Sequence, residues 1–260
     1  MDKDRLKKLA GDERYIPGIY NYCDRWCERC PQTSHCLNFT ISESEFSDPA
    51  TKDIRNEALW KKLSETFTET LELLREAGKK WGIELENLDS GSDSEKMRAE
   101  AEAAEAHVIC RGAKGYSRMV EDWFKERERF FFGMAAFTDE EVGAKEALEV
   151  IRWYQYFIAA KIVRAIRGKM EEEEEGRDEE FPSDADGSAK IALIAIDRSI
   201  GAWALISRHF KLYAESVLEI ISFLGLVRQA VEETFPKARS FIRPGFDTLD
   251  LNVVVSDKES

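Results

Sequence analysis

The chain has 260 residues, enough to bury a core as one large domain or as one domain with a small appendage. Its 43% hydrophobic and 34% charged residues are typical of a globular protein and exclude wholesale disorder. The net charge of −13 argues against non-specific nucleic-acid binding, because such binding needs a cationic surface.

The sequence contains no segment typical of membrane insertion or export. Setting glycine aside, the longest apolar run is Ile191–Ile196, far shorter than the roughly 20 residues needed to span a bilayer. No apolar stretch follows Met1–Arg5, so we expect neither a signal peptide nor a membrane partner. The predicted compartment is the cytoplasm, where thiols stay reduced.

Residues 1–45 are predicted to form a small metal-binding segment, since they hold four of the five cysteines in the pattern C-x3-C-x2-C-x5-C. These four are Cys23, Cys27, Cys30 and Cys36. If residues 22–30 form a helix, the first three cysteines lie on one face within an arc of roughly 60°. Pro31 would end that helix, so that the chain turns and returns Cys36 as a fourth ligand.

Four soft thiolates separated by short loops suit an iron–sulfur cluster or zinc. The compact spacing favours the cluster, because structural zinc sites usually pair two knuckles across a dozen or more residues. Zinc is the alternative, and disulfides or inert thiols are a further one. The C-x3-C-x2-C portion also resembles the cluster-binding signature of radical SAM enzymes over eight residues. The strand–helix alternation and the Gly-Gly-Glu-like run of those enzymes are missing, so no catalytic residue is assigned.

The remaining candidate residues are interpreted without a role as metal ligands. His35 could replace one thiolate, but we favour a solvated loop histidine. Cys110 is isolated and is predicted to be a core residue of a helix. Four aromatic residues crowd the cysteines and are expected to dock this segment onto the rest of the protein: Tyr15, Tyr20, Tyr22 and Trp26.

Residues 46–235 predict a multi-helix bundle. Apolar residues from Trp60 to Trp81 recur at helical spacing, behind an apparent start at Asp48-Pro49 and before a stop at Gly82. A second helix is expected from near Glu95 to Cys110. Glycines at 112 and 115 are expected to interrupt it before helix resumes over residues 116–132.

The next helix is predicted to begin at the capping box of residues 138–141. Its buried face comprises Leu148, Ile151, Tyr154, Ile158, Ile162 and Ile166. The acidic segment at about 171–187 is interpreted as a mobile linker, because residues 169–187 hold ten acidic and only two basic side chains.

The stretch after Ser188 is the most apolar, and we expect it to form the central helix. Its residues predicted to be largely buried are Ile194, Asp197, Trp203 and Phe210. Pro236 should end the last helix. Residues 236–260 then form a docking tail, in which the β-prone residues 253–255 are expected to be extended. Strand signals are too few for a sheet, so the predicted class is all-α, a bundle of about four to six helices.

Charged residues within this apolar stretch form a second candidate site. Lys190, Asp197 and Arg208 share one helix face, and buried charges need partners. A structural ion-pair network is the favoured interpretation. Arg208 lies about 16 Å along the axis from Asp197, so the partner of Asp197 should come from another segment. The available arginines are Arg164, Arg167, Arg239 and Arg243.

These observations lead to two hypotheses. The first is a metal-binding helical protein whose four-cysteine centre, an iron–sulfur cluster or zinc, has a redox or scaffold role. The second is an enzyme whose active site lies inside the bundle near Asp197 and Arg208, with a purely structural zinc. The sequence does not decide whether the protein is an enzyme, and it identifies no protein or small-molecule partner.

Overall fold

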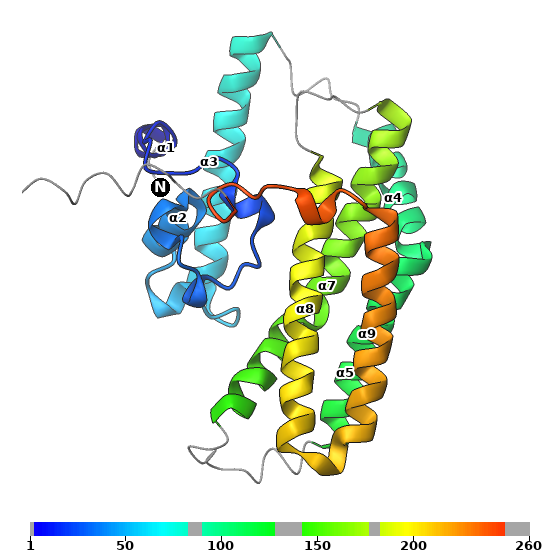
Figure 1. The fold of residues 1–260 in the computed structure, drawn as a ribbon. Coiled ribbons are helices and arrows are strands. Elements are labelled where there is room, and N and C mark those ends of the chain that lie inside the picture. The colour runs from blue at the N-terminus through cyan, green and yellow to red at the C-terminus, as the bar shows by residue number, and fades with distance from the viewer. Residues whose placement is uncertain (1–2, 83–89, 128–141, 177–182, 248–260) are drawn as a thin grey trace, which may run out of the picture. The chain divides into compact units, whose positions relative to one another are not determined.

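The computed structural model describes residues 3–82, 90–127, 142–176 and 183–247, and all regular secondary structure in these ranges is helical. The predicted all-α class is therefore confirmed (Figure 1). The α-helices are α1 (Lys3–Ala10), α2 (Leu37–Glu45), α3 (Glu57–Trp81), α4 (Ser90–Ala106), α5 (Val108–Glu126), α7 (Val142–Glu175), α8 (Asp184–His209) and α9 (Ala214–Thr234). No helix in the described ranges is both long and apolar enough to cross a membrane.

The chain divides into two compact units, and the division differs from the predicted one. The first unit comprises the residues up to Glu95 together with those from Arg243 onward, and the second comprises Lys96–Ile242. α3 belongs to the cysteine-containing unit, so this unit extends beyond the segment predicted for residues 1–45. Lys62 of α3 forms an ion pair with Glu45 of α2, whose carboxylate is almost completely buried.

Four helices of the second unit, α5, α7, α8 and α9, form a four-helix bundle in which each helix packs against two neighbours (Figure 1). α7 and α8 are antiparallel, since Gly168 lies against Ala185 near one end and Gly143 against His209 near the other. Large side chains from all four helices fill the core, among them Tyr116, Ile151, Ile158, Ile162, Leu193, Trp203 and Leu224. The face predicted for α7 is buried as expected, except for Leu148, which is half-buried.

The predicted interruption at Gly112 and Gly115 is wrong, because α5 is continuous through both residues. The break lies at His107, whose Nδ1 accepts a hydrogen bond from the amide of Ile109 (3.3 Å) and caps α5. A Cβ at Gly115 would meet the ring of Phe223 at 3.2 Å, so this glycine lets α5 approach α9 closely. A packing requirement, rather than a turn, explains glycine here.

The acidic segment 171–187 is helical at both ends rather than a linker throughout. α7 continues into it, and acidic side chains there pair with bases one turn earlier, as Glu173 does with Lys169 (3.0 Å). α8 begins directly after Ser183, whose hydroxyl accepts a hydrogen bond from the amide of Asp186 (3.0 Å). The connection is thus confined to residues 176–183, of which 177–182 lie outside the described ranges.

α3 begins later than predicted. Asp48 caps a 3-10 turn, η4 (Pro49–Thr51), and α3 starts behind Asn56, whose side chain accepts a hydrogen bond from the amide of Ala58 (3.0 Å). Gly82 ends the helix in the left-handed conformation, as expected. The apolar residues that predicted the helix do not all pack inward: Trp60, Phe67, Leu71 and Leu74 are exposed.

α8 is the central helix, but less completely buried than predicted. Trp203 is fully buried, whereas Ile194, Asp197 and Phe210 are only partly covered. The helix has two neighbours in the bundle, so one stripe along its length still faces solvent.

Candidate metal centre

The four clustered cysteines lie at the ends of three short 3-10 turns, η1 (Ile19–Tyr22), η2 (Cys27–Arg29) and η3 (Thr33–His35). Cys23 directly follows η1, and Cys27 and Cys30 bracket η2. Cys36 stands between η3 and α2. Each cysteine therefore occupies a point where the chain changes direction.

The helix considered for residues 22–30 does not form. The carboxylate of Asp24 accepts a hydrogen bond from the amide of Trp26 (3.2 Å), which closes a local turn incompatible with an α-helix. Between them, Arg25 has a φ of 60°, and within the described ranges it is the one non-glycine residue with positive φ. Such a residue costs conformational energy and often lies at a functional site.

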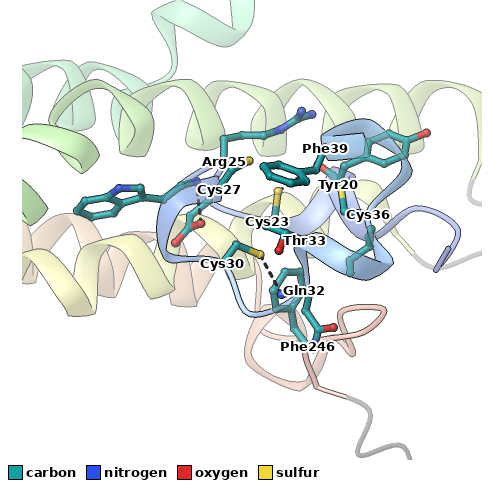
Figure 2. Close-up of a pocket in the computed structure, with 13 residues that line it drawn as sticks. Tyr20, Cys23, Arg25, Cys27, Cys30, Gln32, Thr33, Cys36, Phe39 and Phe246 are labelled. Carbon is teal, nitrogen blue, oxygen red and sulfur yellow. Dashed lines mark hydrogen bonds between the residues drawn. The ribbon is translucent and has the colours of Figure 1, made fainter. Parts of the chain in front are cut away.

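All four side chains nevertheless line one pocket (Figure 2). The pocket encloses about 310 Å³, part of it open to solvent, and the four cysteines are free thiols. Aromatic residues complete the wall: Tyr20, Trp26, Phe39 and Phe246. The residues chosen from their spacing are thus brought together, by turns rather than by a helix face.

The thiols in the pocket influence one another electrostatically. Burial raises the pKa of the Cys27 thiol above its usual value, and the neighbouring cysteines raise it further. Burial also raises the pKa of Cys30, although the amide of Gln32, which donates a hydrogen bond to its Sγ (3.4 Å), opposes the effect. Several thiolates around one pocket repel each other unless a cation lies between them, so metal binding there must release protons.

The thiols do not converge on a single point. Within the described ranges, no three histidine, cysteine, aspartate or glutamate side chains are grouped closely enough to hold a metal ion. A tetrahedral zinc site with bonds of about 2.3 Å needs sulfur atoms about 3.8 Å apart. In a [4Fe–4S] cluster each thiolate binds a separate iron atom, so the cysteine sulfur atoms lie farther apart. The chemistry of the four thiol donors fits both kinds of centre.

The remaining histidine and cysteine candidates lie elsewhere. His35 is not part of the pocket wall; its Nδ1 lies 3.0 Å from the carbonyl oxygen of Arg14. Cys110 is fully buried in α5, as predicted, and burial raises the pKa of its thiol to about 11. Neither residue joins the four cysteines.

Two aromatic residues of the pocket wall were not anticipated. Phe39 lies on α2, three residues after Cys36, and helical spacing from that cysteine would have identified it. Phe246 comes from the far end of the chain, more than two hundred residues after the last of the four cysteines. No local sequence pattern predicts such a long-range contact.

Asp197 and Arg208 do not form a site together. Asp197 accepts a hydrogen bond from Arg239 (2.6 Å) and pairs more loosely with Arg228 (3.4 Å), while Arg208 is exposed at the end of α8. The partner of Asp197 thus comes from another segment, as predicted. Lys190, on the same stripe, donates to the carbonyl oxygen of Phe241. These contacts fasten the chain that follows α9 along α8, a structural role.

No protein-family model matches the chain, and no curated protein or solved structure is significantly similar to it. The radical SAM resemblance also finds no counterpart in the fold, because no strand occurs in the described ranges.

Proposed function

We propose that this is a metal-binding protein in which Cys23, Cys27, Cys30 and Cys36 hold one metal centre. The observation that supports the proposal is that four free thiols, delivered by three separate turns, line a single pocket. A purely structural role for four free cysteines does not require them to share a cavity.

Of the two candidate centres, we propose an iron–sulfur cluster rather than zinc. The compact spacing of the four cysteines along the chain supports it, because structural zinc sites usually pair two knuckles across a dozen or more residues. The amide of Gln32 that donates to Cys30 Sγ is the kind of contact that tunes a cluster's potential. A bound cluster would supply one-electron chemistry, whereas zinc would supply stability alone.

The residues of the pocket wall suggest how the protein would shield such a centre from water and stabilise its charge. Phe39 and Trp26 would keep water from the sulfur atoms, and Arg25 would bring a positive charge close to an anionic centre. Tyr20 also lines the pocket and is partly exposed. Because shielding and a nearby positive charge both tune the potential of a cluster, we favour a redox role over a scaffold role.

The test is to purify the protein without oxygen and to measure iron, sulfide, zinc and the visible spectrum. We expect a coloured protein whose absorbance bleaches on reduction, and loss of the colour when Cys27 is replaced by serine. Cys110→Ser is the matched control and should keep the colour, because Cys110 lies buried in the other unit. A colourless protein with bound zinc would exclude the cluster and retain the metal centre. Protein without either metal would refute the proposal.

A further inference from the structure

The C-terminal residues Arg243–Asp247 form a turn that is stabilised by its own side chains. The amide of Arg243 donates to the carboxylate of Asp247 (3.0 Å), and so does its guanidinium (2.8 Å). The same guanidinium lies over the ring of Phe246, 5.0 Å from its centroid. Both partners of the ion pair are largely buried. The turn thus has a defined shape that carries Phe246 on one side.

This turn packs tightly against the cysteine-containing segment. Gly245 has a φ of 74°, and a Cβ built on it would lie 2.8 Å from the Cδ1 atoms of both Ile16 and Ile19. Real Cβ atoms do not approach so closely, so only glycine fits. Ile19 is itself buried and lines the cysteine pocket. Docking of Gly245 therefore depends on the residues that precede Cys23.

Docking places Phe246 in the wall of the pocket (Figure 2). The other twelve lining residues lie between Ile19 and Phe39, so Phe246 is the distant contribution to the described pocket. A ring supplied from so far along the chain thus forms part of the pocket wall.

From this geometry we propose that the C-terminal turn Arg243–Asp247 closes the metal centre, with Phe246 as the residue that shields it from water. The inference rests on the proposed function. It assigns to residues at the far end of the chain a positioning role at that same site. Because the metal and the turn both select one arrangement of residues 16–36, each should strengthen the binding of the other by the same factor.

The proposal is tested with two glycine variants of the full chain. Gly245→Ala introduces backbone strain and a clash with Ile16 and Ile19. Gly82→Ala is the matched control, since Gly82 has nearly the same φ, 71°, but no atom within 4 Å of the added Cβ. We measure the rate at which anaerobically loaded protein loses metal to an excess of chelator. Gly245→Ala should lose it roughly tenfold faster than the wild type, and Gly82→Ala at the wild-type rate.

Phe246→Ala separates shielding from docking. It leaves Gly245 and the Arg243–Asp247 pair in place, so hydrogen exchange of the turn should stay slow while the centre loses metal faster. The reciprocal measurement compares exchange in residues 243–247 with and without metal, and we expect slower exchange with metal bound.

Two results would overturn the inference and leave the metal centre intact. One is metal loss from Gly245→Ala at the rate of Gly82→Ala. The other is exchange in the turn that does not respond to metal. If the wild type binds no metal at all, the proposed function fails, and this inference fails with it.

Discussion

Two buried serines of the four-helix bundle should respond to alanine substitution with opposite signs. Ser117 of α5 donates to the carbonyl oxygen of Gln155 on α7 (2.7 Å), and the Gln155 amide donates back to the carbonyl oxygen of Ser117 (3.1 Å). Ser188 of α8 is fully buried, and its hydroxyl has no hydrogen-bond partner among the described residues. A buried polar group without a partner loses the hydration that it has in the unfolded chain.

The expected free-energy changes follow from these contacts. Ser117→Ala removes one interhelical hydrogen bond, worth about 1 kcal/mol net. The carbonyl oxygen of Gln155 in α7 then lacks this donor. Ser188→Ala removes an uncompensated burial cost of about 1–3 kcal/mol and gains helix propensity of about 0.5 kcal/mol. We therefore expect Ser117→Ala to lower the free energy of unfolding and Ser188→Ala to raise it. The two variants should differ by about 2–4 kcal/mol, because the helix-propensity gain applies to both positions and cancels.

Urea unfolding followed by circular dichroism measures both variants. The bundle holds Trp203 and Trp123 in its core, so tryptophan fluorescence gives an independent signal for the same transition. Equal destabilisation by the two substitutions would refute the reasoning, since it would mean that the Ser188 hydroxyl makes a favourable contact in the folded protein.

Three further predictions concern charge and backbone strain. Asp197→Asn should cost only about 1 kcal/mol, because the side chain is 39% exposed, and the cost should shrink in high salt; thermal unfolding at two salt concentrations measures both. Burial raises the pKa of Tyr116 to about 12, above the value near 10 of the unfolded chain. The unfolded state thus loses its proton first, and stability should fall between pH 10 and 12, less so in Tyr116→Phe. Arg25→Gly should be more stable than Arg25→Ala by about 1 kcal/mol in chemical unfolding, since both remove the side chain and only glycine relieves the positive φ.

Long helices of the bundle were predictable because their signal is repeated many times along the sequence. In α7, Ile151, Ile158 and Ile162 recur at helical spacing, and all three are buried. Single glycines, in contrast, give no repeated signal from which their role can be predicted. Gly112 and Gly115 are equally consistent with a helix break and with a close helix–helix contact, and only the presence of α9 decides between them.

The prediction of a linker from about residue 171 was wrong at the end of α7, which continues to Glu175. A dense run of acids predicts a solvated linker when it is read alone. Here bases one turn earlier in the helix, such as Lys169, offset part of the repulsion and allow the helix to continue. The cost of a charged surface helix is set by pairs on its face rather than by net charge.

At the candidate centre, the residues were predictable while their local geometry was not. Successive cysteines are only three to six residues apart, at most about 22 Å in a fully extended chain and much less once the chain turns. Many backbone paths, helical or not, therefore bring them to one pocket. The actual path depends on the turn at Asp24 and on the positive φ of Arg25, neither of which the cysteine spacing encodes.

Phe246 in the pocket wall could not be predicted in this way. Short cysteine spacing limits where residues of the same segment lie, but it does not indicate which distant residues pack against that segment. Phe246 reaches the pocket because Gly245 fits against Ile16 and Ile19, and that fit is a property of two surfaces rather than of either sequence. If the cysteines hold a metal as proposed, its binding would be a property of the segment, whereas its protection would depend also on the distant turn. The two should separate experimentally, because a peptide of residues 1–45 would bind metal and lose it quickly to a chelator, while the full chain would release it slowly. Equal rates of loss from peptide and full chain would show that the distant turn contributes nothing to the centre.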